Sequence, residues 1–79
     1  MTDDAGGHLD DARRRLGLSH YDLWVRYIGV GGTRDAHAVR SYLTGRVILT
    51  DGDHDHLAVA LNEAFVDAGH RQRLRYRHS

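Results

Sequence analysis

Residues 50–69 read TDGDHDHLAVALNEAFVDAG and carry the clearest helical pattern in the chain. Apolar side chains recur there at intervals of three and four residues, which places them on one face of an α-helix. These side chains are Leu57, Leu61, Ala64, Phe65 and Ala68. Asp53 and Asp55 fall in or before the first turn, where the helix dipole favours negative charge. Gly69 follows the last apolar position, as glycine commonly does at a helix end. The pattern predicts a helix over residues 53–68.

Three shorter helical patterns precede this segment, over residues 8–16, 19–28 and 34–44. Ser19 suits the N-cap of the second helix because its hydroxyl can accept from the unpaired amides of the first turn. Thr33 is the corresponding candidate for the third helix. Glycines interrupt the pattern between the helices, as helix ends require. Together the four segments predict an all-α, helix-turn-helix-like domain.

The predicted core collects the apolar side chains that share these helical faces, together with one residue of the connection before the last helix. It consists of Leu16, Leu23, Trp24, Tyr27, Ile28, Val39, Leu43, Leu49, Leu57, Leu61 and Phe65. Residues 47–49 are either a short strand or an extended connector. A three-residue strand is not stable alone, and its candidate partner is residues 73–77, where side chains alternate at strand period.

The composition restricts the class of protein. A chain of 79 residues forms one domain and buries only about 60% of the surface that its unfolded form exposes. Such marginal stability favours dimerisation or folding against a partner. There is no cysteine, which excludes disulfides and a cysteine-based zinc site and fits a reducing, cytoplasmic setting. The net charge is zero, so charge alone indicates no partner.

The two ends of the chain differ in charge from each other. Residues 1–7 are rich in Asp and Gly and are predicted to be a flexible N-terminus without a secretory signal. Residues 8–69 form the predicted helical domain, and residues 70–79 form a basic C-terminal tail. No apolar run approaches the roughly 18 residues that span a membrane.

Two helices joined by a glycine-containing turn are typical of helix-turn-helix proteins. RRLGLS at 14–19, VRSYLTGR at 39–46 and LAVAL at 57–61 resemble the lambda-repressor-like (Cro/C1-type) domains. That resemblance implies an all-α fold that binds DNA, although the turn after residue 29 is longer than in the family. The spacing of LW, RY, GG, YLTG and ALNE across residues 9–69 is also similar to small uncharacterised helical proteins of high-GC Gram-positive bacteria, which implies no activity.

Basic and hydroxyl side chains form a polar face on the predicted helix 34–44. They are Arg34, His37, Arg40, Ser41 and Thr44. Such residues can donate to phosphates or read base edges in a major groove, and an ordinary solvated helix face has the same composition. In the tail, Arg73, Arg75 and Arg77 can neutralise phosphates or meet an acidic protein surface. A solubilising end is the third interpretation of the tail.

Aromatic residues supply the candidate partner-binding surface. Aromatics at helical spacing usually belong to a core, but in so small a fold one edge can remain exposed and bind a protein. The candidates are Tyr21, Trp24 and Tyr76.

Catalytic and metal-binding patterns are weak. Residues 51–56 read DGDHDH, with carboxylates and imidazoles at a spacing that matches neither a calcium loop nor an i,i+4 zinc pair. We interpret them as an acidic helix start and expect no metal, no cofactor and no enzyme activity. The sequence thus predicts a small regulatory interaction module that binds a protein partner or itself. The alternative is a DNA-binding transcriptional regulator that uses the polar face of helix 34–44.

Overall fold

The computed structural model describes residues 5–69, which form four α-helices and no strand. The helices are α1 (Ala5–Arg15), α2 (His20–Gly29), α3 (Ala36–Leu43) and α4 (Asp51–Asp67). The predicted all-α, four-helix fold is therefore confirmed. Of the two alternatives for residues 47–49, the structure shows the connector: the segment joins α3 and α4 without forming a strand. Residues 73–77, its candidate partner, lie outside the described residues.

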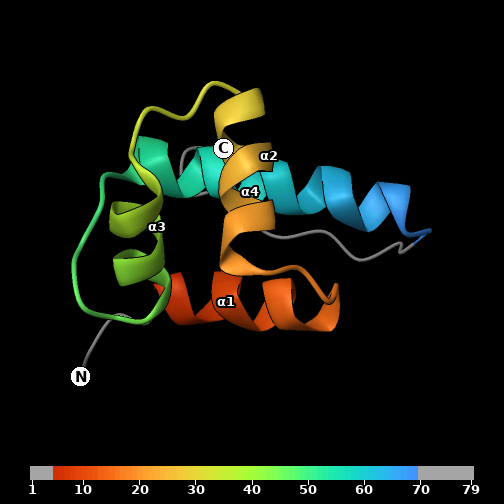
Figure 1. Cartoon of the computed structure of the whole chain (residues 1–79), viewed down its shortest axis with the longest axis horizontal. Coiled ribbons are helices and arrows are strands. Elements are labelled where there is room, and N and C mark those ends of the chain that lie inside the picture. The colour runs from red at the N-terminus through yellow and green to blue at the C-terminus, as the bar shows by residue number, and fades with distance from the viewer. Residues whose placement is uncertain (1–4, 70–79) are drawn as a thin grey trace.

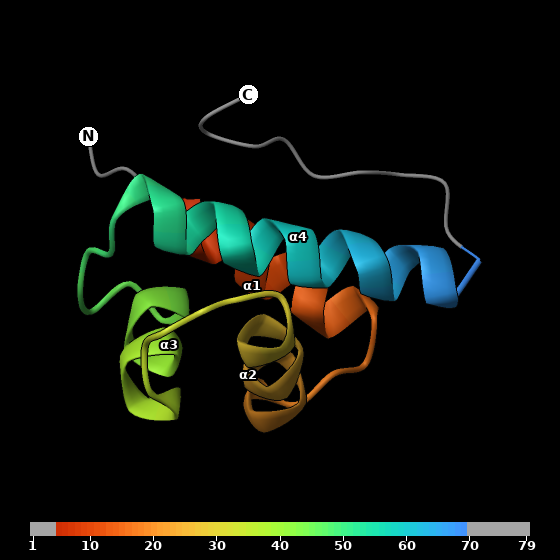
Figure 2. The same cartoon turned by 90° about the horizontal axis from the view of Figure 1, so that it is seen from above.

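The helices are arranged as two pairs that cross each other. α1 and α4 lie side by side and run in the same direction (Figure 1). α2 and α3 form an antiparallel hairpin whose two helices are both seen end-on in Figure 2, across the pair α1 and α4. α4 packs against α1 and α2, while α3 packs against α1 and α2. The connection between α2 and α3, residues 30–35, is longer than the turn of about 3–4 residues in the helix-turn-helix motif.

The helix starts show where local sequence determined structure. Ser19 caps α2 as predicted: its hydroxyl accepts from the Asp22 N–H at 3.0 Å, and the Asp22 carboxylate accepts from the Ser19 N–H at 3.3 Å. Thr33 was the wrong cap for α3. The helix begins later, after Asp35, whose carboxylate accepts from the Ala38 N–H at 2.8 Å.

α1 begins at Ala5 and so includes residues 5–7, which the sequence analysis assigned to the flexible N-terminus. The physical reason is a close approach of two backbones. Gly6 is buried, and a Cβ at this position would collide with the Tyr42 carbonyl oxygen. Glycine lets the first turn of α1 pack directly on the end of α3.

The core confirms most of the predicted apolar set. Seven predicted residues are buried: Leu23, Tyr27, Val39, Leu43, Leu57, Leu61 and Phe65. Leu16, Trp24 and Leu49 are partly buried at the margin of this cluster. The prediction for Ile28 was wrong, because its side chain is 41% exposed. Tyr27 faces the core, and the next residue of a helix points about 100° away.

Residues outside the predicted core set complete it. They are Leu9, Ala12, Tyr42, Ala58, Ala60 and Ala64. Four of the six are alanines, and three of these lie on α4. Small side chains let neighbouring helices approach α4 closely, so this helix is buried over a wider arc than its large apolar residues indicate.

The hydroxyl of Tyr27 organises the connection between α2 and α3. It accepts from the backbone N–H of Thr33 at 3.2 Å and of Arg34 at 3.0 Å, and it lies 3.3 Å from the Asp53 carboxylate on α4, to which it donates. The chain passes over the ring at Gly32, where a Cβ would collide with the aromatic carbons. One buried side chain thus joins α2, the 30–35 connection and α4.

Replacing Tyr27 with Phe should destabilise the fold. The substitution keeps the ring but leaves the part-buried N–H groups of Thr33 and Arg34 without their acceptor. A fully buried unsatisfied group costs about 1–3 kcal/mol, and the partial burial of these two places the expected loss near the lower end of that range. Urea denaturation would measure the free energy of unfolding, with Tyr21→Phe as the matched control because Tyr21 is exposed. Equal stability of the two variants would contradict this role of the hydroxyl.

Candidate functional site

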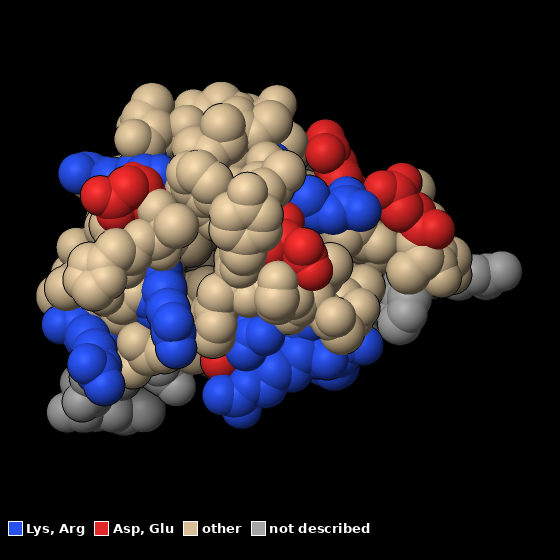
Figure 3. Space-filling view, in the orientation of Figure 1, with Lys and Arg blue, Asp and Glu red and all other residues tan. Residues whose placement is uncertain are grey.

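The outward side of α2 carries a row of exposed apolar side chains. Tyr21 is 64% exposed, Val25 48% and Ile28 41%. Their spacing of four and three residues places them on one side of the helix. We call these three residues, with the adjoining Trp24, the α2 face. Figure 3 shows uncharged surface over α2, with acidic and basic side chains around its edge.

Trp24 anchors the α2 face to the rest of the fold. Its indole N–H donates to the Arg34 carbonyl at 3.0 Å, and its ring is partly buried. The Tyr21 ring lies against it, with ring centroids 5.8 Å apart and planes tilted by 45°. The two predicted partner-binding residues that the structure describes are therefore in contact. Val25 and Ile28, which the sequence analysis did not assign to a partner surface, extend it along the helix.

Two charged residues of α2 itself, Asp22 and Arg26, border the α2 face on one side. Asp22 is exposed and belongs to the cap of α2. Arg26, one turn further, forms an ion pair with Asp67 of α4 at 3.1 Å. The opposite border is formed by Trp24. The α2 face therefore has an aromatic edge and a charged edge.

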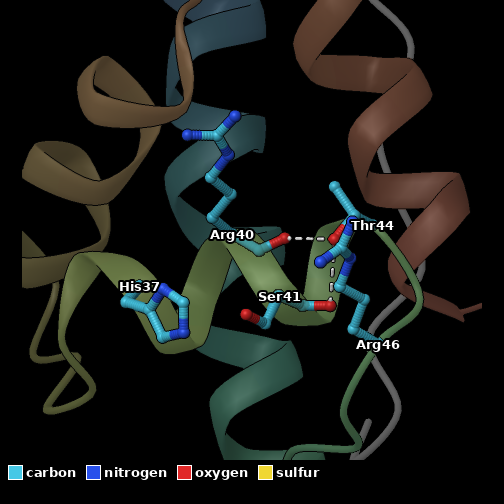
Figure 4. Close-up of a pocket in the computed structure, with 5 residues that line it drawn as sticks. All are labelled: His37, Arg40, Ser41, Thr44 and Arg46. Atoms are coloured by element: carbon cyan, nitrogen blue, oxygen red, sulfur yellow. Dashed lines mark hydrogen bonds between the residues drawn. The ribbon is translucent and has the colours of Figure 1, made fainter.

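A second surface is a hollow of about 240 Å³ beside α3, lined by His37, Arg40, Ser41, Thr44 and Arg46. Four of the five residues predicted for the polar face of this helix meet there. Arg46 was missed; the available signal was a basic residue directly after the glycine that ends the helix. In Figure 4 the Arg46 guanidinium lies beside Thr44, whereas the Arg40 side chain extends away from the other four.

The hydroxyls of this hollow are only partly available to a ligand. Ser41 is buried, with 9% of its surface exposed. The Thr44 hydroxyl donates to the carbonyls of Arg40 at 3.0 Å and Ser41 at 3.3 Å. Among residues 5–69, no ion pair is found for Arg40 or Arg46. The cationic groups are thus the part of the hollow most accessible to an anion.

Arg34 lies apart from this hollow and has a structural role. Its Nε donates to the Asp53 carboxylate at 3.0 Å, and Asp53 also accepts from the Thr50 hydroxyl at 2.9 Å. Burial acts to raise the pKa of Asp53, but the hydrogen bonds from Arg34 and Thr50 and the charge of Arg34 outweigh it, so the pKa lies below its ordinary value. Arg34 therefore pairs across the fold with the first turn of α4.

Asp10 forms a second buried ionic cluster, between α1 and α2. It accepts from Arg13 at 2.7 Å, pairs with Arg14 at 2.9 Å, and lies 3.3 Å from the His20 ring. Burial raises its pKa, but the two arginines bring the net shift below the ordinary value. The pKa of His20 is also lowered, through burial and the charge of Arg13. Asp10 and Arg14 are four residues apart on α1, a spacing at which opposite charges on a helix can pair.

The Asp and His residues at the start of α4 are used within the fold. Asp53 bonds to Tyr27, Thr50 and Arg34, and His54 Nδ1 lies 2.7 Å from the Tyr42 hydroxyl. Across residues 5–69, no group of three or more potential ligands is arranged to hold a metal ion. None of the helices described is long and apolar enough to cross a membrane. Arg73, Arg75, Tyr76 and Arg77 lie outside the described residues.

Comparisons with known proteins leave the chain without an assigned family. No protein-family model matches it, and neither the curated proteins nor the solved structures contain a match. The two resemblances drawn from the sequence therefore remain expectations.

The Asp53 cluster predicts acid sensitivity. A carboxylate whose pKa is lower in the folded state than in the unfolded state stabilises the fold above the unfolded pKa, and this stabilisation is lost as the pH falls through the folded value. Urea denaturation at about pH 7 and about pH 3 should show a loss of stability in acid. Asp53→Asn should lose less between the two pH values than the unchanged protein. An identical loss would show that Asp53 is not a source of the pH dependence.

Proposed function

We propose that this protein is a small, non-enzymatic regulatory interaction module that binds a protein partner, or a second copy of itself, through the α2 face. The observation that carries the proposal is the row Tyr21, Val25 and Ile28, exposed along one helix and backed by Trp24. Aromatic and aliphatic side chains gathered on one surface are typical of the centre of a protein interface.

The energetics favour covering this face. Removing apolar surface from water yields about 25 cal/mol per Å². Tyr21 has two side-chain torsions, so ordering it at an interface costs little entropy compared with a long flexible side chain. Trp24 is already held by its bond to the Arg34 carbonyl. The α2 face is thus partly organised before any partner arrives, which reduces the cost of binding.

The placement of ionisable groups supports a non-enzymatic role. Among residues 5–69, the carboxylates of Asp10 and Asp53 have lowered pKa values. Asp10 pairs with Arg13 within α1. Asp53 pairs with Arg34 of the connection before α3, and neither carboxylate lines the hollow beside α3. Catalytic groups with shifted pKa values typically face a cleft. The shifts of Asp10 and Asp53 are better explained by ion pairs that stabilise the fold.

DNA binding through α3 is the second candidate function. The cationic groups of Arg40 and Arg46, without ion pairs among residues 5–69, favour it because arginine binds phosphate well. The pairing of Arg34 with Asp53 and the burial of Ser41 count against it. The connection of residues 30–35 between α2 and α3 is also longer than the turn of the helix-turn-helix motif.

Duplex DNA tests the second candidate. If α3 binds DNA, Arg40→Glu combined with Arg46→Glu should weaken binding and lower the slope of affinity against salt by about one per lost phosphate contact. Fluorescence anisotropy across a salt series measures both quantities. Arg26→Glu on α2 is the control, because it makes the same arginine-to-glutamate change at a position outside α3. This variant should bind DNA as tightly as the unchanged protein. A wild-type protein that does not bind duplex DNA at low salt excludes this candidate.

Site-specific photocrosslinking tests the first candidate. A photoreactive phenylalanine analogue at position 21 should yield covalent adducts in cells, because a partner covers this position. The same group at position 66 is the control, because Val66 is 53% exposed on α4 and is not one of the residues of the α2 face. Adducts are measured by mass. Equal yields from the two positions, or none from position 21, would refute binding through the α2 face.

A further inference from the structure

We infer that the occupant of the α2 face is a second copy of this chain, paired antiparallel about a two-fold axis next to Val25. The inference rests on the proposed function, since it names the partner of the same face. It is carried by the self-complementarity of α2. When two copies of this helix lie antiparallel, the aromatic edge of one faces the aromatic edge of the other, and the charged edges face each other in the same way.

The helix geometry defines those edges. Each residue turns the helix by about 100° and advances it by about 1.5 Å. With Val25 at the centre of the exposed side, Tyr21, Trp24 and Ile28 project toward one edge. Asp22, Arg26 and Gly29 project toward the other. The burial of the helix agrees, because Leu23 and Tyr27 are buried while Trp24 and Arg26 are intermediate.

A two-fold axis in the plane of the interface reverses the direction of the helix but keeps each edge on its own side. Residue numbers that face each other then sum to 50, with Val25 opposite Val25 of the second copy. On the aromatic edge, Tyr21 comes next to Ile28 of the second copy. The two exposed apolar side chains at opposite ends of α2 therefore cover each other, and the symmetry repeats the contact.

The charged edge is complementary in the same arrangement. Asp22 of one copy lies within one helical turn of Arg26 of the other, on the same side of the interface. The contact occurs twice, with opposite charges each time. A parallel two-fold arrangement would instead place the charged edge of one copy against the aromatic edge of the other, so Asp22 and Arg26 would meet no opposite charge across the interface. Gly29 lies on this edge, where an added Cβ would meet nothing within 4 Å, so it leaves room for the second helix.

The size of α2 sets the expected strength. A helix of 10 residues is about 15 Å long. Its exposed side is smaller than the roughly 1,200 Å² that stable interfaces bury in total. The dimer should therefore be weak and should form reversibly as concentration rises.

Sedimentation velocity from about 10 μM to about 1 mM tests the dimer with the full chain. The unchanged protein should shift from monomer to dimer across this range. Val25→Arg should raise the dissociation constant at least about tenfold, because it places a cation opposite its own copy. Val66→Arg adds the same charge outside the α2 face and should leave the dimer unchanged. Circular dichroism confirms that each variant is folded.

A charge exchange tests the antiparallel register. Arg26→Asp should dimerise less by itself, because it meets Asp22 of the second copy. Asp22→Arg should also dimerise less, because it meets Arg26. A mixture of the two variants restores both attractive contacts and should form heterodimers at concentrations where each variant alone is monomeric. Asp22→Arg also removes part of the cap of α2. The experiment still works, because a heterodimer forms only if both variants are folded.

The outcomes separate this inference from the proposed function. A protein that stays monomeric to the highest concentration, or a dimer that Val25→Arg leaves intact, overturns the second-copy assignment. A dimer without rescue in the mixture overturns the antiparallel register. If position 21 then still crosslinks to another protein, the α2 face remains a docking surface and only its occupant changes. If position 21 crosslinks to nothing, the proposed function fails as well.

Discussion

The buried hydroxyl of Tyr27 is the interaction on which the arrangement of this small domain depends. It receives two backbone N–H groups from the connection after α2 and donates to Asp53 at the start of α4. Asp53 in turn pairs with Arg34 of the same connection. A polar group this deep is stable only when its hydrogen bonds are satisfied, so the network permits one path for the chain between α2 and α3.

This constraint also determines which side of α2 faces outward. Because Tyr27 and Leu23 are fixed in the core, residues 21, 25 and 28 must lie on the opposite side. The exposed apolar row is therefore not a local packing defect. The carbonyl of Arg34, held near Tyr27 by its own N–H, also accepts the Trp24 indole. The buried network and the α2 face thus share one segment of backbone.

The sequence predicts the features that depend on nearby residues. The four helices, the Ser19 cap and most of the core follow from spacing, capping chemistry and glycine positions. The candidate sites are predicted less well. Tyr27 and Ile28 are adjacent apolar residues, and only the contact with Asp53, 26 positions away, decides that Tyr27 points inward. Arg34 was predicted to lie on the polar face of the third helix. It instead pairs with Asp53, 19 positions away, a contact that helical spacing does not reveal.

The proposed dimer depends on the two edges of α2. Contacts within the fold hold Trp24 on one edge and Asp22 and Arg26 on the other, and in the dimer both edges gain a second use across the interface. Asp22 also serves the cap of α2 and Arg26 also pairs with Asp67, so contacts within the fold already hold both charges in place beside the α2 face. In the proposed dimer, their order along the helix brings opposite charges together when a second helix runs past in the reverse direction. For a domain of this size, such a contact adds buried surface that a single core of four short helices does not supply.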